Sequence, residues 1–386
     1  MVAVFIYRDR LLRWASRQQA KYSVTSEVSP VIPAPTFGSA PFALSAHTGG
    51  GPGIGHTAEE ALAATIATAR AADRHGYHRF WMSEHHAMPG LSVASPPLMI
   101  ARLTADTERI RLGAGGVMLP NHAPLVIAEQ FGMLDALAPG RIDLGLGRAP
   151  GTDGATAAAL RRGAGANDAF PQQVDELLGF LADDFPAGHP YSDVHAVPGP
   201  WQNAQNRVPA PSTQPQVWIL GSSPYSARLA ARLGRPYAFA LQFGDADITT
   251  AMRLYREEFT PSSVLDRPYS LVSVSAIASD DAAEARREAS TSAMAMLRMF
   301  KREPYALLSP EEVAAYEATA NEQAIIDLYT NRAFAGTAET VAHRLEALQE
   351  QTAVDEVMTV VGTHSRGADA RTVRLLAKHY GVKAQP

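Results

Sequence analysis

Three runs of unusual chemistry lie between Tyr77 and Pro150: Trp81-Met82-Ser83-Glu84-His85-His86, Gly113-Ala114-Gly115-Gly116-Val117-Met118-Leu119-Pro120-Asn121-His122, and Gly140-Arg141-Ile142-Asp143-Leu144-Gly145-Leu146-Gly147-Arg148-Ala149-Pro150. Each run contains the end of a short β-rich segment, so we place the runs at the ends of three successive strands. Side chains just past the C-terminal ends of the strands line the active-site mouth of a (β/α)8 barrel. We therefore expect the three runs to converge in one site.

The alternation of strand and helix patterns runs from Pro41 to the C-terminus. Eight strands are predicted, at 42–46, 78–83, 110–117, 141–146, 216–221, 237–241, 270–278 and 355–361. Helices are predicted at 57–75, 96–107, 124–138, 171–182, 224–234, 248–259, 280–301, 338–350 and 368–380. Repeated strand–helix units imply a parallel sheet, and eight of them suit a closed barrel better than an open sheet. The predicted fold class is therefore α/β, a (β/α)8 TIM barrel with insertions.

Capping residues support several of these boundaries. Thr57 precedes two glutamates and is placed to cap the first helix. Gly76, Gly140 and Gly234 follow predicted helices, where a residue in the left-handed conformation is expected.

The barrel domain is predicted to span residues 41–386, preceded by an extension of residues 1–40. The extension lacks the apolar core and cleavage site of a secretory signal, so we expect it to be poorly ordered, with an amphipathic targeting arm as the alternative. Residues 183–215 and 301–335 interrupt the alternation. Long loops in a compact domain are usually lids or binding segments, so we interpret these two stretches as insertions within one domain.

Composition excludes several classes of partner. The hydrophobic fraction is 46% and the charged fraction 19%, as in ordinary globular proteins, and the formal net charge is −5. The charge argues against a nucleic-acid partner, which needs a basic face. No stretch reaches the roughly 18 consecutive apolar residues of a membrane span. The chain has no cysteine, which excludes disulfides and thiolate sites and is consistent with a cytoplasmic location.

Glu84, His85 and His86 follow the apolar end of the second predicted strand. Successive side chains on a strand point to opposite faces, so both histidines cannot face one pocket unless the strand has ended. We expect one to face the cavity while the other histidine or Glu84 orients it. Histidine exchanges protons near neutral pH, which suits a general acid or base at a barrel mouth. A pair of structural loop histidines is the alternative.

A metal site is the other use of histidines in this region. His47, His85, His86 and His122 all lie just past predicted strands. Zinc-binding barrel hydrolases usually bring a His-x-His pair from the first strand, but that place here reads Ser45-Ala46-His47-Thr48, and no His-Glu-x-x-His helix is present. We therefore predict no catalytic metal.

Gly115-Gly116 stands at the end of the third predicted strand. Paired glycines let a backbone approach a flat ligand closely or adopt a conformation that is costly for other residues. A plain strand-end turn is equally compatible with this spacing.

An anion site is predicted where the fifth strand leads into the next helix. The segment Gly221-Ser222-Ser223-Pro224-Tyr225-Ser226 opens that helix, and the free amides and dipole of a helix N-terminus bind phosphate. Its serine hydroxyls add donors, and Arg148 supplies a positive charge past the fourth strand. Ordinary helix capping and a solvated surface arginine are the alternatives.

Together, these motifs resemble those of bacterial luciferase-like flavin-dependent monooxygenases, and most nearly the alkanal-monooxygenase-like members. The motifs that carry the resemblance are Glu84-His85-His86, Gly115-Gly116-Val117-Met118-Leu119-Pro120, Ala128-Glu129-Gln130, Pro139-Gly140-Arg141-Ile142-Asp143-Leu144-Gly145-Leu146-Gly147-Arg148, Gly221-Ser222-Ser223 and Gly336-Thr337-Ala338-Glu339-Thr340-Val341. Singly they are weak, and their order makes the resemblance specific. It covers the chain from about Pro41 to the C-terminus.

The resemblance implies a barrel that binds reduced FMN supplied by a separate flavin reductase. Molecular oxygen would add to the flavin to give a hydroperoxide, which acts on an aldehyde or another small organic substrate. The protein's part is to bind and orient these molecules and to exclude water. We further expect a cytoplasmic homodimer with neither a nucleic-acid nor a membrane partner.

The resemblance also implies roles for individual residues. His85 corresponds to the catalytic histidine, with His86 in support. Gly115-Gly116 corresponds to a non-proline cis peptide under the isoalloxazine ring. Arg148 corresponds, with Ser223 and Ser226, to the clamp on the FMN phosphate. The cofactor-binding residues that we predict are Gly115, Gly116, Arg148, Gly221, Ser222, Ser223, Tyr225 and Ser226.

Two other functions are weighed against this one. A barrel oxidoreductase that transfers hydride with a deazaflavin is disfavoured by the Glu84-His85-His86 run, and a flavin-binding subunit without turnover has no need of both His85 and Arg148. The chain departs from the family pattern at Leu241-Gln242-Phe243, where many relatives have a histidine before the phenylalanine. It also departs at 202–214, which is longer than usual and predicts a changed lid.

Overall fold

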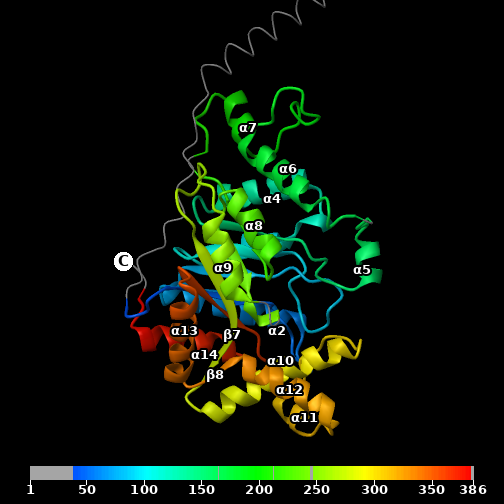
Figure 1. Ribbon diagram of the computed structural model, residues 1–386, viewed down its shortest axis with the longest axis vertical. Coiled ribbons are helices and arrows are strands. Elements are labelled where there is room, and N and C mark those ends of the chain that lie inside the picture. Colours follow the sequence, from blue (N-terminus) through cyan, green and yellow to red (C-terminus); the bar gives the residue numbers. More distant parts are fainter. Residues whose placement is uncertain (1–37, 164, 212, 244–246, 384–386) are drawn as a thin grey trace, which may run out of the picture.

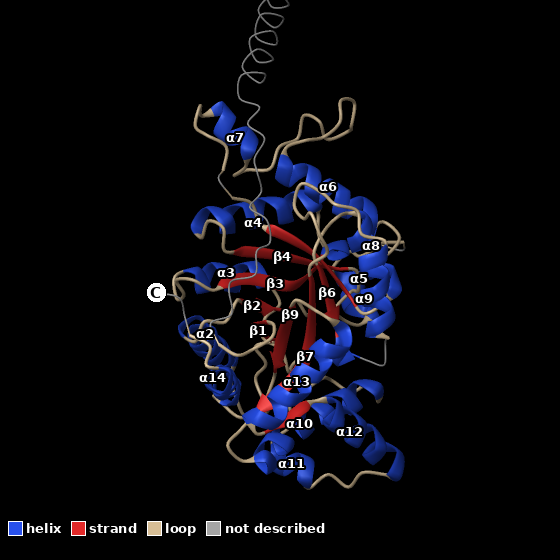
Figure 2. Ribbon diagram, turned by 60° about the vertical axis from the view of Figure 1, so that its left-hand side comes forward, coloured by secondary structure: helices blue, strands red, loops and turns tan. Residues whose placement is uncertain are grey.

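Eight parallel strands close into a barrel, and helices surround it (Figures 1 and 2). The computed structural model describes residues 38–163, 165–211, 213–243 and 247–383. Strands β1 to β7 pair in order, and β9 lies between β7 and β1, which completes the ring. The predicted (β/α)8 barrel is therefore confirmed.

The barrel strands correspond to the eight predicted strands, with ends that differ by at most two residues. They are β1 Ala43–Thr48, β2 Arg79–Met82, β3 Arg111–Met118, β4 Ile142–Gly147, β5 Gln216–Gly221, β6 Tyr237–Ala240, β7 Ser270–Ala278 and β9 Glu356–Val361. A further strand, β8 (Phe334–Gly336), pairs with the end of β7 outside the ring. It was not predicted, because three residues are too few to show a strand pattern.

The nine predicted helices are all present. They are α2 Ala58–Arg74, α3 Pro96–Thr104, α4 Pro124–Leu137, α6 Phe170–Ala182, α8 Pro224–Arg232, α9 Ile248–Glu257, α10 Ala282–Phe300, α13 Ala338–Thr352 and α14 Ala368–Tyr380. Thr57 caps α2 in a reciprocal arrangement with Glu60. Gly76, Gly140 and Gly234 have positive φ angles, as expected for residues that end helices.

Side-chain alternation along the strands separates two cores. In β4, Ile142, Leu144 and Leu146 belong to the large cluster between strands and helices. A smaller cluster, made from other strands and the segment before β7, fills the inside of the barrel around Trp81 and Trp218, whose rings meet edge to face. Because alternate residues of a strand face opposite sides, the positions between the outward residues of β4 face the barrel interior.

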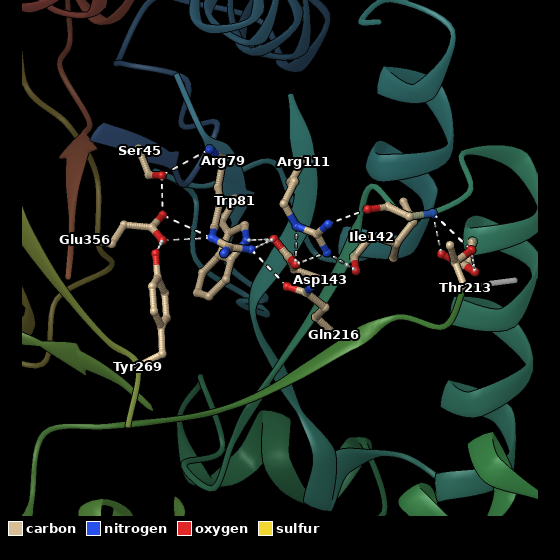
Figure 3. Close-up of polar contacts among 12 residues, drawn as sticks. Ser45, Arg79, Trp81, Arg111, Ile142, Asp143, Thr213, Gln216, Tyr269 and Glu356 are labelled. Atoms are coloured by element: carbon tan, nitrogen blue, oxygen red, sulfur yellow. Dashed lines mark hydrogen bonds and ion pairs between the residues drawn. The ribbon is translucent and has the colours of Figure 1, made fainter. Parts of the chain in front are cut away.

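A buried network of charges fills the barrel interior near the start of the strands (Figure 3). Arg79 Nη1 lies 2.8 Å from Asp143 Oδ2, and its Nε lies 3.0 Å from Glu356 Oε2. Arg111 Nη2 lies 2.7 Å from the other oxygen of Asp143. The side chains of Arg79, Asp143 and Glu356 are 0% exposed. Two cations and two carboxylates balance, which is the condition under which buried charges are tolerated.

Neutral donors complete this network. Trp81 Nε1 donates to Asp143 over 3.0 Å, and the Tyr269 hydroxyl donates to Glu356 over 2.8 Å. Burial alone would raise the pKa of Asp143, but the two arginines outweigh it and lower that pKa to about 2. These charged and neutral groups stabilise the fold at the N-terminal ends of the strands. The C-terminal ends are therefore free to form a functional site.

The two interruptions lie between barrel units. Helix α7 (Pro200–Gln205) belongs to the first, and Figure 1 shows it beyond the end of α6. Helices α11 (Pro310–Ala314) and α12 (Ala320–Arg332) belong to the second, and α5 (Gly154–Ala159) lies in the loop after β4. The lid assigned to 202–214 stays a prediction, as does the poorly ordered extension, whose residues 1–37 lie outside the described part of the chain.

The second interruption reaches back to the mouth of the barrel. Gly90 N–H donates to the Tyr305 carbonyl, and Ile54 N–H donates to the Leu307 carbonyl, both over 2.8 Å. The segment 304–308 therefore rests on the loops that follow β1 and β2.

Candidate active site

The carboxylate of Glu84 organises the side chains just past β2. One of its oxygens lies 2.8 Å from His86 Nε2 and 2.8 Å from His122 Nε2, and it accepts a longer bond of 3.3 Å from Asn121. The other oxygen accepts from the Met118 N–H over 3.0 Å. Glu84 is 1% exposed, so it is held almost entirely by these groups. Two of the three quoted sequence runs thus converge on one residue.

Glu84 is an anion despite its burial. Burial would raise its pKa, but hydrogen bonds from His122, His86 and the Met118 N–H outweigh that effect, and the pKa is lowered. The sequence pointed to Glu84 only as a partner for a neighbouring histidine. Its contact with His122 joins residues 38 positions apart, which no local motif reveals.

His85 makes a different contact from its neighbour. Its Nδ1 lies 3.2 Å from the carbonyl oxygen of Gly151, in the loop after β4. A carbonyl oxygen only accepts, so Nδ1 carries the hydrogen and Nε2 of the neutral ring holds a lone pair. Burial is the largest effect on this ring and lowers its pKa. At neutral pH His85 is therefore an uncharged base, while His86 is the histidine that Glu84 orients.

The peptide bond between Gly115 and Gly116 is cis, as the resemblance implied. Neither position has room for a side chain. A Cβ on Gly115 would lie 2.8 Å from the Trp81 ring, and one on Gly116 would lie 2.6 Å from the Gly145 carbonyl oxygen. The Gly116 carbonyl accepts from the Glu84 N–H over 3.2 Å, which fixes this peptide beside the Glu84 cluster.

The N-terminus of α8 offers free backbone donors. Its N-cap residue, Ser223, has an extended backbone and makes no side-chain capping bond within the described residues. The guanidinium of Arg148 lies over the ring of Tyr225, 4.2 Å from its centroid. A positive charge and uncapped amides thus lie together on the rim between β4 and β5, which suits a phosphate.

The serines of this segment are not equivalent. The Ser226 hydroxyl is buried and donates to the Ser223 carbonyl over 2.9 Å, and it also lies 3.1 Å from the Tyr237 hydroxyl. Ser226 is therefore placed to offer its backbone N–H rather than its side chain. Gly221 leaves no space for a Cβ, which would lie 2.5 Å from Ser226 Cβ. Ser222 and Ser223 are half-exposed on the same rim.

One residue that the sequence did not indicate ties the two halves of the rim together. Arg162, in the loop after α5, donates to Asn121 over 2.7 Å and to the Arg148 carbonyl over 2.7 Å. It therefore links the Glu84 cluster to the backbone of Arg148. Only its position in a long loop after a barrel strand could have suggested it.

After β6, the segment at which the chain departs from the family pattern forms a short turn of 3-10 helix, Leu241–Phe243. Gln242 accepts a hydrogen bond from the Ser273 hydroxyl over 3.0 Å. The resemblance implied a histidine at this place, and the amide that stands here is polar but not titratable.

Within the described residues, no group of three or more His, Asp or Glu side chains is arranged to hold a metal ion. None of the helices described is both long and apolar enough to cross a membrane.

The fold and the mouth together define a (β/α)8 barrel with polar and charged side chains gathered past the ends of its strands. The family model for luciferase-like monooxygenases matches residues 40–356. A luciferase-like monooxygenase of Escherichia coli (strain K12) is 41% identical over 305 residues, which are 79% of this chain and 87% of the relative. The crystal structure of apo-MsnO8 superposes with a TM-score of 0.76 at 31% identity and covers 89% of this chain and 99% of its own. The chain belongs to the luciferase-like monooxygenase family, whose members are flavin-dependent.

More distant solved structures share the fold and hold different flavins. The oxygenating constituent of 3,6-diketocamphane monooxygenase from Pseudomonas putida, in complex with FMN, has a TM-score of 0.64 at 19% identity and covers 88% of this chain and 98% of its own. An F420-dependent secondary alcohol dehydrogenase with an F420–acetone adduct has a TM-score of 0.63 at 13% identity, covering 87% and 97%. At these identities the likeness shows the barrel alone.

Proposed function

We propose that this protein is the oxygenase of a two-component system, which takes reduced FMN from a separate reductase and uses molecular oxygen on a small organic substrate. The observation that carries the proposal is the uncapped N-terminus of α8 beside Arg148. A glycine-only face lies on the same end of the barrel, at Gly115-Gly116. FMN carries both a phosphate and a flat ring, so it has a group for each of these two features.

Each part of FMN has a counterpart in the residues of the mouth. The phosphate fits the amides of Tyr225 and Ser226 together with the Arg148 guanidinium. The isoalloxazine ring is assigned to the Gly115-Gly116 peptide, whose Cβ positions are already filled by Trp81 and the Gly145 carbonyl. Reduced FMN supplies the electrons that activate oxygen.

The histidines of the mouth have two proposed roles, which are to transfer protons and to orient neighbouring groups. Nε2 of His85 is an uncharged base at neutral pH, so it can take a proton from a reacting group and return it. His86 and His122 share the carboxylate of Glu84, so they are placed to orient neighbouring groups. Catalysis is thus proposed to rest on His85, with His86 in support.

Loss of the Arg148 charge is expected to weaken FMN and spare riboflavin. A charge-assisted phosphate contact contributes about 1.5–3 kcal/mol, so Arg148→Ala should raise the Kd for FMN roughly 10- to 100-fold. Riboflavin lacks the phosphate, and its Kd should change by less than about twofold. Fluorescence titration of the full chain with both flavins measures this.

Arg228→Ala is the matched control for the flavin titration. Arg228 lies on α8, the helix whose N-terminus forms the proposed phosphate site, but it pairs with Glu258 over 2.9 Å. Its loss changes the net charge equally and should leave both affinities unchanged. Equal weakening of FMN and riboflavin by Arg148→Ala would contradict the phosphate assignment.

We propose that the protein is a homodimer that pairs through α4. The inner face of α4 packs in the main core, yet Val126, Met133 and Leu137 on its outer side are 46%, 56% and 62% exposed. Their spacing of seven and four residues puts them in one stripe. The neighbouring helix α3 adds Leu98, which is 75% exposed. An exposed apolar stripe of this kind marks an interface, and a self-complementary one forms a two-fold dimer.

A charge within this stripe is expected to separate the subunits. Leu137→Glu should convert a dimer into a monomer in sedimentation or light scattering at micromolar concentration, because it buries an unpaired carboxylate in the interface. Leu328→Glu is the control, since Leu328 is similarly exposed on α12. A wild-type protein that is monomeric under these conditions, or a Leu137→Glu variant that stays dimeric, would contradict the proposal.

A further inference from the structure

The inner wall of the barrel carries a histidine to which the proposed function assigns no role. His47 is the fifth residue of β1, and Ser45, two positions earlier, binds Glu356 inside the barrel. Alternation along the strand therefore turns His47 inward as well. A Cβ on Gly115 would lie 3.1 Å from His47 Cδ2, so the imidazole lies beside the cis peptide.

The hydrogen bond of His47 fixes which nitrogen carries its hydrogen. Nε2 lies 3.2 Å from the carbonyl oxygen of Gly115, and a carbonyl only accepts, so Nε2 is the protonated nitrogen. Burial is the main effect on the ring, and nearby His85 adds to it, so that the pKa is lowered to about 4 although the bond to Gly115 acts in the opposite direction. At neutral pH the ring is uncharged, and Nδ1 holds a lone pair.

Nδ1 of His47 has no hydrogen-bond partner among the residues that the structure describes, and it is fully buried. The whole residue is only 7% exposed. Buried polar atoms in proteins are nearly always paired, and an unpaired one costs the free energy of its lost hydration. An unpaired acceptor beside a ligand-binding face therefore points to a partner that arrives with a ligand.

The position of His47 in the ring of strands separates it from the phosphate end of the flavin site. The proposed phosphate site lies at β5, and the flat glycine face lies on β3. The strands run β5, β4, β3, β2, β1 around the barrel, so His47 lies on the far side of the glycine face. With FMN bound as proposed, a substrate that contacts His47 would approach it from the side of the glycine pair away from the phosphate site.

We propose that His47 is a specificity-determining residue whose Nδ1 accepts a hydrogen bond from the substrate, and that the substrate carries an O–H or N–H group. This inference rests on the proposed function, because the flavin site defines the place of the substrate. An alcohol, a phenol or an amide meets the requirement. A plain aliphatic aldehyde has only an acceptor and would leave Nδ1 unpaired. Sites built to bind a substrate hydroxyl reject analogues that lack it far more strongly than apolar pockets discriminate size.

The test uses matched pairs of probes that differ only in the donor hydrogen. Benzyl alcohol is compared with benzyl methyl ether, 4-hydroxybenzaldehyde with 4-methoxybenzaldehyde, and decan-1-ol with decyl methyl ether. Each is titrated into the full-length protein saturated with FMN, and binding is followed by calorimetry and flavin fluorescence. In at least one pair the donor-bearing member should bind about 10-fold more tightly, the scale of one lost hydrogen bond to a buried acceptor. A panel in which no donor-bearing probe exceeds its ether overturns the proposal.

Two substitutions separate the two nitrogens of His47. His47→Gln can keep an N–H in the position of Nε2 but has no acceptor in the position of Nδ1, so the preference for the donor should disappear. His47→Asn keeps an oxygen near the position of Nδ1, so part of the preference should remain. A preference that survives in His47→Gln overturns the proposal.

FMN affinity is measured first, and it separates this inference from the proposed function. Wild-type protein that does not bind FMN refutes the proposed function itself. Wild-type protein that binds FMN without discriminating any pair refutes only the role of His47. If His47→Gln weakens FMN and leaves the probes unaffected, Nδ1 meets the flavin and the substrate role is wrong.

A second measurement needs no ligand. NMR of protein with ¹⁵N-labelled histidine, assigned by the signal that disappears in His47→Gln, reports which ring nitrogen is protonated. The expected result is a neutral ring with hydrogen on Nε2 at pH 7. A hydrogen on Nδ1 would overturn the proposal, because that nitrogen could not then accept.

Discussion

Replacing His85 with Ala is expected to lower product formed per reduced FMN by roughly 100-fold or more, the usual scale for a lost acid–base group. FMN affinity and thermal stability should stay close to those of the wild type, because the His85 side chain lies at the rim and, among the described residues, its hydrogen bond is to the Gly151 carbonyl. The oxygen that is consumed should appear as hydrogen peroxide instead of product. Single-turnover experiments with reduced FMN and a substrate from an aldehyde and alcohol panel measure the ratio.

A matched variant separates the role of His85 in proton transfer from its role in holding the loop that contains Gly151. His85→Asn retains a donor near the position of Nδ1, so the bond to Gly151 can persist while the base at Nε2 is lost. It should be as inactive as His85→Ala. His86→Ala should cost less, since His86 is held by Glu84 and has a supporting role. Full coupling in His85→Ala would refute its assignment and make His86 or His122 the candidate.

The largest expected loss of stability follows from removing Arg79. Its side chain is 0% exposed and lies between Asp143 and Glu356, so Arg79→Met leaves Glu356 buried without this cation and Asp143 with Arg111 alone. Breaking a buried pair from one side costs about 3–5 kcal/mol. Urea unfolding should show a much lower midpoint, or a soluble protein that no longer unfolds cooperatively.

Two variants test whether the lost charge balance is the reason for the lower stability of Arg79→Met. Arg79→Met with Glu356→Gln removes one cation and one carboxylate together, and it should be more stable than Arg79→Met alone. Arg253→Met breaks an exposed pair with Glu257, and its midpoint should stay near that of the wild type. If Arg79→Met is as stable as Arg253→Met, the network does not hold the barrel together.

The same network contributes to acid stability. The pKa of Asp143 is lowered in the fold to about 2, below its ordinary value near 4. A carboxylate with a lowered pKa adds stability that is present above its unfolded pKa and is lost as the pH falls through its folded pKa. The contribution of Asp143 is therefore complete above about pH 4 and disappears toward pH 2.

The barrel could be predicted from the sequence because its signals are local and repeated. Apolar strands and capped helices alternate eight times, and a capping pair such as Thr57 and Glu60 acts within one turn. Strand β8 and helix α7 could not be predicted in this way. Each has six residues or fewer and depends on tertiary contacts more than on pattern.

The candidate site was predictable only in part, for a similar reason. The family motifs led to His85 and to the Gly115-Gly116 peptide, whose cis bond is confirmed. They did not lead to Arg162 or to the orphan nitrogen of His47, because both depend on contacts across the barrel. Ser226 shows the converse: its type suggested a phosphate donor, but its hydroxyl is already bound to the Ser223 carbonyl.

The shared carboxylate of Glu84 determines how this rim can vary. His86, Asn121 and His122 all bind one oxygen of Glu84, and Met118 binds the other. Residues that share a partner do not act additively when they are changed together. In a library of combined substitutions these positions would show strong epistasis: the first change removes most of the cluster's contribution, and a second costs less than it would alone. Single substitutions that change substrate preference are therefore expected more often at positions outside the cluster, because there a change does not require a second, simultaneous substitution.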